Sequence, residues 1–454
     1  MNMKRSLPLV LTLAALGTCQ SASATNGYFT HGLGVKNKGM AGAGTASPSE
    51  VISAASNPAA AAMVGNKYEG GISVFSPRRS YKAGPSQANG NFGAFTLGPN
   101  DVDSGRNYFP IPYLGKSWQL EDNTAWAINF YGRGGMNTDY SGGTATLDPD
   151  GPGLAPVTRL DGPYGAGPGG VNLSQAFFDV TYAIKTGGLN LGVSGVIAFQ
   201  GFSAKGVGTL GGFTKSFAAS GGTALPTQLT DNGTDYSYGL GMKVGAIYEV
   251  NDQLNLGIAY QSRTYMSEFD DYADLFAENG DFDIPASVSL SASYAATPVL
   301  SLHFTYERTM YSKIASVGNG IQNLFACPTA GAGGTDLESC LGGSNGPGFG
   351  WDDVDAYKFG AEWAGAAGTT YRAGFSTAKQ PIGNDQVLFN VLAPGVVEKH
   401  ITAGFSHDLG DGREVSAMLM YAPSVSVAGA NTFDPSQQIE LEMSQYEFEI
   451  GYSF

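Results

Sequence analysis

Large apolar side chains alternate strictly with small or polar ones in fourteen separate segments of this chain. Successive side chains of a β-strand point to opposite faces of a sheet, so each segment is predicted to form a strand with one apolar and one polar face. The predicted strands are 68–80, 107–120, 123–134, 172–185, 189–203, 236–250, 253–266, 284–296, 299–311, 352–364, 369–379, 398–409, 413–426 and 443–454.

The connections between these segments alternate in length without exception. Short links occur around Glu121-Asp122, Thr186-Gly187-Gly188, Asn251-Asp252, Thr297-Pro298, Ala366-Ala367-Gly368 and Gly410-Asp411-Gly412. Long loops rich in Gly, Pro and Asx lie near 81–106, 135–171, 204–235, 267–283, 312–351, 380–397 and 427–442. Outer-membrane barrels have an even strand number, short turns on one side and long loops on the other. We therefore expect residues 67–454 to form a 14-stranded antiparallel transmembrane β-barrel; the alternative is a large secreted all-β protein.

The N-terminus has the pattern of a secretory signal peptide. Lys4 and Arg5 precede the apolar stretch 7–16 and the small residues 22–24, which predicts cleavage after residue 24. Cys19 suggests a lipoprotein, but the threonine before it fits a lipidation box poorly. Loss of Lys4 and Arg5 changes the formal net charge from −15 to −17, which disfavours binding to nucleic acid.

Composition supports a barrel in the outer membrane of a Gram-negative bacterium. No run of 18 apolar residues follows the signal peptide, so no transmembrane helix is expected. The 66 Gly, 25 Phe and 23 Tyr suit many turns and aromatic girdles. In the last strand Phe448, Ile450 and Tyr452 are expected to face lipid, opposite Glu447 and Glu449. The terminal aromatic, Phe454, is expected to be read by the barrel-assembly machinery.

The same alternation assigns the lumen. In 284–294 the odd-numbered serines are expected to face inward, and Ile284, Val288, Leu290 and Tyr294 outward. Lipid-facing Lys or Arg costs about 2–4 kcal/mol at the midplane, so charged side chains such as Glu362 are placed inward. Inward apolar residues give the lumen a surface for a hydrophobic solute, unless a bulge swaps the faces. The substrate-path candidates are Phe177, Lys243, Lys358, Arg372, Met418 and Met420. Each of the three cations has the alternative role of neutralising a luminal carboxylate.

Two cysteines remain after cleavage, Cys327 and Cys340, in a Gly-rich segment. An oxidising compartment favours a disulfide between them. A zinc site is the alternative, but no further histidine or cysteine that could bind zinc lies nearby in the sequence. We expect neither a metal nor a cofactor.

Residues 25–66 do not alternate. Ser47-Pro48-Ser49-Glu50 has the pattern of a capping box, which predicts a helix through about residue 56. Asn57-Pro58 should end it, and the alanines 59–62 should form another turn. Such a segment ahead of a barrel is expected to plug the lumen; a flexible leader is the alternative.

Three motifs in this segment carry a resemblance to a known family. They are Asn26-Gly27-Tyr28-Phe29-Thr30-His31-Gly32-Leu33-Gly34, Lys38-Gly39-Met40-Ala41-Gly42-Ala43-Gly44-Thr45-Ala46 and Asn57-Pro58-Ala59. Together they resemble the FadL family of outer-membrane transporters of long-chain fatty acids and hydrocarbons. The resemblance implies an N-terminal hatch that contains Asn57, Pro58 and Ala59, and a lateral opening made by a kinked strand. Pro110 and Pro112, and the glycines 132, 134 and 135, are candidates for that distortion.

Other functions have weaker support. Residues 206–211 match a dinucleotide fingerprint and 342–346 a nucleophile elbow by letters, but both lack the required strand and helix context. A lipid hydrolase and a general diffusion porin remain the alternatives to a non-enzymatic transporter. The acidic clusters 148–150 and 352–355 are expected to be solvated, or to bridge through cations to lipopolysaccharide. We expect a monomer.

Overall fold

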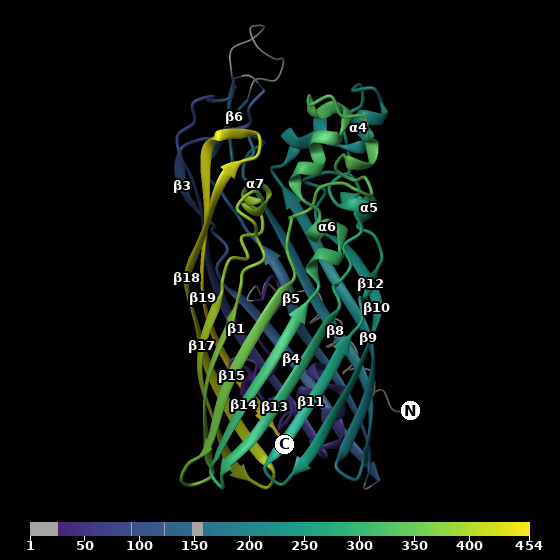
Figure 1. The fold of residues 1–454 in the computed structure, drawn as a ribbon, viewed down its shortest axis with the longest axis vertical. Helices are drawn as coiled ribbons and strands as arrows, with labels where there is room; N and C mark the ends of the chain where they lie inside the picture. The colour runs from purple at the N-terminus through teal and green to yellow at the C-terminus, as the bar shows by residue number, and fades with distance from the viewer. Residues whose placement is uncertain (1–25, 92, 122, 148–157) are drawn as a thin grey trace, which may run out of the picture.

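The computed structural model describes residues 26–91, 93–121, 123–147 and 158–454, so the predicted signal peptide and the acidic cluster 148–150 lie outside it. The described chain forms one antiparallel sheet of sixteen strands rolled into a tall barrel (Figure 1). Two of them, β3 (Asn100–Asp103) and β12 (Tyr265–Met266), are short additions. The other fourteen are β1 (Lys67–Ala83), β4 (Phe109–Glu121), β5 (Thr124–Asn137), β8 (Gly170–Thr186), β9 (Leu189–Lys205), β10 (Asp235–Asn251), β11 (Leu254–Gln261), β13 (Ser287–Thr297), β14 (Leu300–Thr309), β15 (Val354–Ala364), β16 (Thr369–Ala378), β17 (Lys399–Gly410), β18 (Arg413–Asn431) and β19 (Asp434–Ser453).

Each of the fourteen strands pairs with its sequence neighbours, and β19 pairs with β1 to close the sheet. Closure removes the two free edges that an open sheet would expose. Short turns lie at one end, called here the turn end, and long connections at the other, called the loop end (Figure 1). This confirms the predicted 14-stranded antiparallel barrel.

The loop end carries its own small structures. β2 (Thr96–Leu97), β6 (Thr144–Leu147) and β7 (Thr158–Asp161) form a three-stranded sheet. Four short helices, α4 (Lys215–Ala219), α5 (Ala277–Gly280), α6 (Ala315–Gly318) and α7 (Val387–Asn390), and several single-turn 3₁₀ segments also lie there. Cys327 and Cys340 are joined by a disulfide, with Cα atoms 4.8 Å apart.

The prediction of a long loop at 427–442 is wrong. β18 continues to Asn431 and β19 begins at Asp434, so the two strands form a hairpin that rises at the loop end. Ile439, Leu441 and Met443 are buried on one face of that hairpin. The period of two therefore continues through this segment, where the small and polar residues between the apolar ones suggest a loop.

Exposed and buried side chains alternate along the strands, as the two predicted faces require. On the outer surface Leu419 is 61% exposed and Phe448 45% exposed, whereas Met418 and Glu447 on either side are buried. This continuous apolar exterior is the surface that a barrel presents to lipid. Ile284 is an exception: it was expected to face outward but is buried, because it lies in the loop before β13 and bridges to Thr264.

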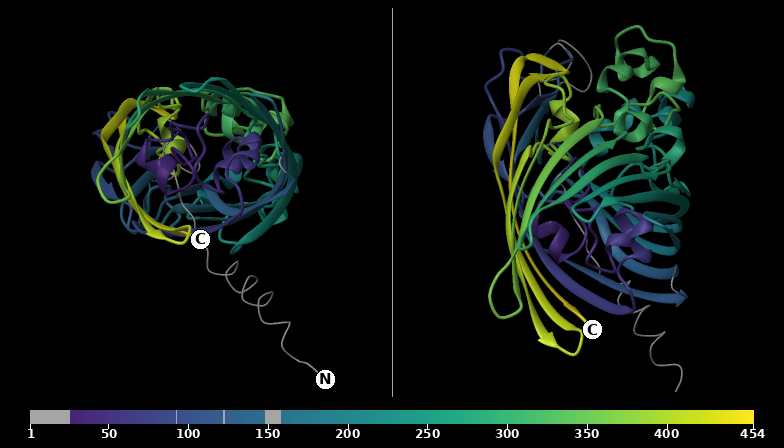
Figure 2. Two further views of the ribbon diagram at one scale, coloured as in Figure 1. Left: turned by 90° about the horizontal axis from the view of Figure 1, so that it is seen from below. Right: turned by 60° about the horizontal axis from the view of Figure 1, so that its bottom comes forward.

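Residues 26–66, called here the N-terminal segment, lie inside the barrel (Figure 2). They include α2 (Val35–Gly39), α3 (Ser53–Ser56) and the 3₁₀ helix η1 (Pro58–Ala62). The predicted capping box is wrong: α3 begins only at Ser53 and has no side-chain cap, because the Glu50 carboxylate binds elsewhere. No described helix is long and apolar enough to cross a membrane.

We predict that Leu419→Lys lowers the free energy of unfolding in lipid vesicles by about 2–4 kcal/mol, because it places a charge near the bilayer midplane. Leu409→Lys, at the turn end of β17, should cost less than about 1 kcal/mol. Urea titration of both variants checks the difference. Equal costs would contradict the assigned depth of these residues.

Candidate functional site: an apolar passage and the N-terminal segment

A buried ion triad fastens the N-terminal segment to the barrel wall. The Lys38 ammonium of α2 lies 2.6 Å from Glu447 Oε1 and 2.5 Å from Glu449 Oε2 of β19. Burial opposes the charge of Lys38, but the attraction of these two carboxylates outweighs it and raises the pKa of Lys38. The polar face of the last strand thus holds a cation from the other end of the chain.

His31 lies beside this triad and is neutral. Its ring stacks on that of His400 at 5.4 Å, and Nε2 lies 3.3 Å from the Lys38 carbonyl oxygen. Burial, aided by the charges of Lys38 and Lys358, lowers the pKa of His31 to about 3. Nδ1 lies 3.8 Å from Glu447, yet burial and the two cations outweigh that attraction.

Glu50 caps α2 rather than α3. Its carboxylate accepts hydrogen bonds from the backbone amides of Lys36 at 2.9 Å and Asn37 at 3.0 Å. Burial raises the pKa of Glu50, and the charge of Lys36 opposes that rise. A carboxylate of the barrel wall binds the segment in the same way: Glu69 of β1 accepts a hydrogen bond from the backbone amide of Val51.

The three luminal cations expected on a substrate path each have a carboxylate partner. Lys243 lies 2.7 Å from Asp179, Lys358 2.5 Å from Glu307 and Arg372 2.7 Å from Glu362. Two of them also hold the N-terminal segment: Lys243 donates to the Ala55 carbonyl at 2.8 Å, and Lys358 donates to the His31 carbonyl at 2.9 Å. Contact with a substrate stays a prediction for all three.

Asn57, Pro58 and Ala59 fit closely against β9 and β10. The Asn57 side chain accepts from the Ala59 amide at 3.1 Å and donates to the carbonyl of Ile258 at 3.2 Å. A Cβ on Gly192 would overlap Pro58, and one on Gly245 would overlap Asn57. Glycine at these two wall positions makes the room that the segment occupies.

The predicted apolar patches of the lumen are buried. Phe177 stacks on Tyr131 at 5.4 Å. Met418 and Met420 are 2% and 3% exposed, on the strand against which α2 packs. Their role on a substrate path also stays a prediction.

The barrel wall is split between β4 and β5 towards the loop end. β4 pairs with β5 only as far as Tyr113 and Tyr131, although β5 runs on to Asn137. Pairing of β5 with β8 shifts register between Gly132 and Gly134, which is the bulge expected from those glycines. Pro110 and Pro112 leave the β1 ladder regular, contrary to expectation, but lie on the part of β4 that no longer pairs with β5.

The start of the N-terminal segment lies against this bulge. The Thr30 amide donates to the Arg133 carbonyl and the Gly135 amide donates to the Tyr28 carbonyl, both at 3.0 Å. The Arg133 guanidinium lies 4.6 Å from the centre of the Phe29 ring. The segment therefore pairs with β5 where β4 does not.

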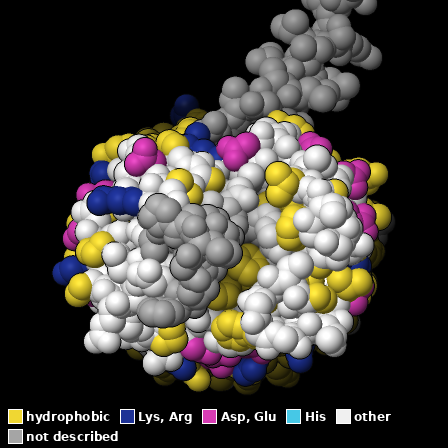
Figure 3. All heavy atoms as spheres, turned by 90° about the horizontal axis from the view of Figure 1, so that it is seen from above, with side chains coloured by type: hydrophobic (Ala, Val, Ile, Leu, Met, Phe, Trp, Pro, Cys, Tyr) yellow, Lys and Arg dark blue, Asp and Glu magenta, His cyan; other side chains and the backbone are white. Residues whose placement is uncertain are grey.

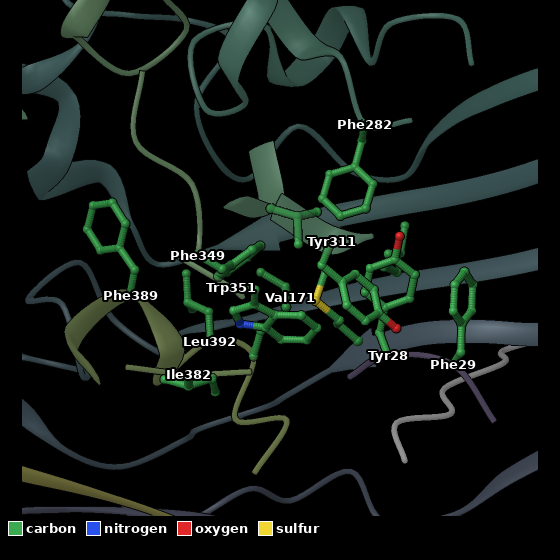
Figure 4. Close-up of a cluster of buried hydrophobic side chains, with 14 of the residues drawn as sticks. Tyr28, Phe29, Val171, Phe282, Tyr311, Phe349, Trp351, Ile382, Phe389 and Leu392 are labelled. Carbon is green, nitrogen blue, oxygen red and sulfur yellow. The ribbon is translucent and has the colours of Figure 1, made fainter. Parts of the chain in front are cut away.

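Six rings converge above this contact (Figure 4). The Tyr28 ring lies 4.8 Å from Phe29, 5.0 Å from Tyr311 and 5.9 Å from Trp351, measured between ring centres. We call the aromatic cluster Tyr28, Phe29, Phe282, Tyr311, Phe349 and Trp351. It joins the N-terminal segment to two long connections of the loop end, the one before β13 and the one between β14 and β15.

Two pockets flank the aromatic cluster. The outer pocket, lined by Phe202, Leu275, Phe276, Leu341, Phe349 and Phe389, opens among the loops. Figure 3 shows hydrophobic side chains in a hollow near the middle of the loop-end face. The inner pocket, lined by Phe75, Arg79, Met136, Asn137, Trp351 and Met443, lies beside the wall split. Phe349 lines the outer pocket and Trp351 lines the inner one, and their ring centres lie 6.2 Å apart. We call the two pockets and the cluster between them the apolar passage.

Sequence reasoning missed most of this passage. Trp351, Phe349 and Phe389 come from loops that show no strand period, so no pattern assigned them an environment. Tyr28 and Phe29 were visible as the aromatic pair within the first family-like motif. Arg79 carried no signal beyond its place in an alternating strand.

Comparisons with known proteins place the fold. The sequence matches no family model and no curated protein. The structure resembles that of the toluene transporter TodX of Pseudomonas putida, with a TM-score of 0.62 and 16% identity over 93% of this chain and 98% of that one. A FadL homologue of Pseudomonas aeruginosa is similar with a TM-score of 0.63 and 15% identity, over 94% of this chain and 99% of that one. The toluene transporter TbuX of Ralstonia pickettii is similar with a TM-score of 0.54 and 18% identity, over 92% of this chain and 98% of that one. This likeness confirms, at the level of the fold, the resemblance to the FadL family.

We predict that Lys38→Met loosens the N-terminal segment, because it leaves two buried carboxylates without their cation. Breaking a buried pair costs about 3–5 kcal/mol. In planar bilayers the variant should show frequent ion-conducting openings, where the wild type shows few. Lys185→Met, which removes a half-exposed partner of Glu249, should change the opening frequency little. Wild-type behaviour of Lys38→Met would contradict the anchoring role of the triad.

Acid should also loosen the segment through His31. A released His31 takes up a proton below its ordinary pKa near 6.5, whereas the docked residue stays neutral down to about pH 3. Docking therefore weakens as pH falls from about 6.5 to 3, by about 2 kcal/mol at pH 5. Channel openings should become more frequent between about pH 7.5 and pH 5, and His31→Gln should reduce that rise, whereas His407→Gln should retain it. A full rise in His31→Gln would exclude this origin.

Proposed function

We propose that this protein is an outer-membrane transporter that takes up long-chain fatty acids or related hydrophobic compounds by passive diffusion. One observation carries the proposal: apolar pockets lie both among the loops and beside the wall split, and Tyr28 and Phe29 of the N-terminal segment pack in the aromatic cluster between them. A water-filled pore offers a hydrophobic solute no favourable surface, whereas this lining lowers the cost of leaving the lipid or micelle.

In this proposal the loop end faces the cell exterior and captures the solute in the outer pocket. The solute then passes the aromatic cluster when Tyr28 and Phe29 withdraw with the N-terminal segment, which acts as a hatch. The unpaired length of β4 and β5 offers a lateral exit. Toluene and monoaromatic hydrocarbons, named for the similar structures TodX, TbuX and CymD, fit the same lining.

In this proposal the barrel lies in the outer membrane of a Gram-negative bacterium as a monomer, assembled by machinery that reads Phe454. The apolar side chains on its exterior support the membrane location. Asp353 and Asp355 at the loop end pair with Arg308, which supports a solvated ion network rather than a free site for cations bridging to lipopolysaccharide.

We infer that the chain is not an enzyme. Ser344, in the elbow-like pattern, lies in a loop where its amide donates to Glu338 at 2.8 Å. The four histidines lie in the N-terminal segment or in barrel strands, namely His31, His303, His400 and His407. Release of fatty acid from phospholipid by the purified protein, lost in Ser344→Ala, would favour the lipid hydrolase instead.

The function is tested by uptake in a deletion strain. The strain should take up labelled oleate and toluene more slowly than its parent, and the wild-type gene should restore the rate. Parental uptake in the deletion strain would refute the proposal. A general porin would instead show steady conductance in the wild-type protein.

The hatch is tested in the same strain with a cross-link. A Cβ on Gly39 would lie 3.5 Å from the Gly404 Cα of β17, so Gly39→Cys with Gly404→Cys should form a disulfide between the segment and the wall. The oxidised pair should not restore uptake until a reductant is added, and each single variant should restore it throughout. Normal uptake by the oxidised pair would exclude movement of the segment.

A further inference from the structure

Arg79 differs from every other buried cation of the described chain. Seven Lys or Arg side chains are buried there, and six of them lie within 4.0 Å of a carboxylate oxygen. Those six are Lys36, Lys38, Arg133, Lys243, Lys358 and Arg372. Arg79 is 5% exposed, and no carboxylate of the described residues is paired with it. A buried charge without a counter-ion is costly, so this position favours an anion from outside the chain.

The guanidinium is held in place but not neutralised. Its Nη1 and Nη2 atoms donate to the backbone carbonyls of Asn137 and Arg106, which carry no charge. An arginine side chain has five N–H donors, so Nε–H and one N–H on each Nη remain. The Nε atom is buried and has no acceptor among the described residues.

Further polar atoms without partners lie around Arg79. The Tyr81 and Tyr140 rings lie 5.1 Å apart, and both hydroxyls are buried without a hydrogen bond inside the described chain, as is Asn137 Oδ1. Tyr140 and the second cation, Arg106, both act on Arg79 electrostatically. The surroundings thus contain two hydroxyl groups, an amide oxygen and a second cation. Asp103, which is exposed, acts electrostatically on Tyr140 but is not paired with Arg79.

Arg79 also lies at the end of the apolar passage. It lines the inner pocket together with Phe75, Met136 and Trp351, and Trp351 belongs to the aromatic cluster. Met136 and Asn137 lie on the length of β5 that β4 leaves unpaired. The inner pocket thus has an apolar side at Trp351 and Phe75 and a charged end at Arg79.

We propose that Arg79 binds the carboxylate of an amphipathic substrate in the inner pocket, and so selects hydrophobic compounds with one anionic head group. The proposal rests on the proposed transport function and names the substrate class within it. Carboxylate oxygens match the guanidinium geometry and form charge-assisted hydrogen bonds with it. Lys243, Lys358 and Arg372 do not compete for this role, because luminal carboxylates already hold them.

Equilibrium binding of labelled dodecanoate and dodecanol to the purified full-length protein in non-ionic detergent tests this. The two ligands share a chain length and differ in charge. Arg79→Met, which keeps an apolar side chain of similar length, should weaken dodecanoate binding about tenfold or more and change dodecanol binding less than about threefold. Arg79→Lys should retain part of the preference. Arg78→Met is the matched control, since its neighbouring side chain points outward to Tyr108, and should behave as wild type.

The outcomes separate the two proposals. Equal weakening of both ligands by Arg79→Met would show that Arg79 only braces the carbonyls of Asn137 and Arg106, and would overturn this inference. Unchanged dodecanoate binding would overturn it as well. A wild-type protein that binds neither ligand would instead overturn the transport function on which the inference rests.

Discussion

The pairing of buried charges between the N-terminal segment and the luminal wall is the constraint on which the rest of the structure depends. A lipid-facing barrel must turn its polar side chains inward. When a segment fills that lumen, the polar side chains lose water, and each charge then needs a partner. Lys38 between Glu447 and Glu449, and Lys358 between Glu307 and the His31 carbonyl, meet this need. These contacts fix one docked position for the segment.

The docked position in turn defines the passage. Once α2 is fastened to β19, the chain ahead of it lies against the bulge of β5, and Tyr28 and Phe29 complete the aromatic cluster. Polar contacts therefore hold the segment while apolar contacts close the route. In the proposed function, one movement of the segment would break both sets of contacts, which links the proposed gate to the ion triad. Arg79 lies outside the triad, where the passage meets the split wall, and its charge is left for a ligand.

Much of the fold could be predicted from sequence because the residues of each strand alternate between apolar and polar, which indicates the two faces of that strand. Leu419 and Phe448 are outward and Met418 and Glu447 inward, as the alternation indicates. The predictions were wrong where one local sequence pattern is compatible with two different structures. The hairpin at 427–442 has the small and polar residues of a loop, and Glu50 has the spacing of a capping box but caps α2, which precedes it in the chain. The bulge at Gly132 and Gly134 was predicted correctly, whereas the distortion expected at Pro110 and Pro112 is absent from the β1 ladder.

The sequence by itself determined the strand number, the antiparallel order and the face of each strand, since a period of two and the loop lengths are local properties. Tertiary structure alone decided which charges are neutralised and where the apolar passage runs. Lys38 and Glu447 are 409 positions apart, and the rings of the aromatic cluster come from four separate segments. Burial and pairing depend on which distant residues meet, so no single stretch of sequence distinguishes Arg79, without a carboxylate, from Lys243, which has one.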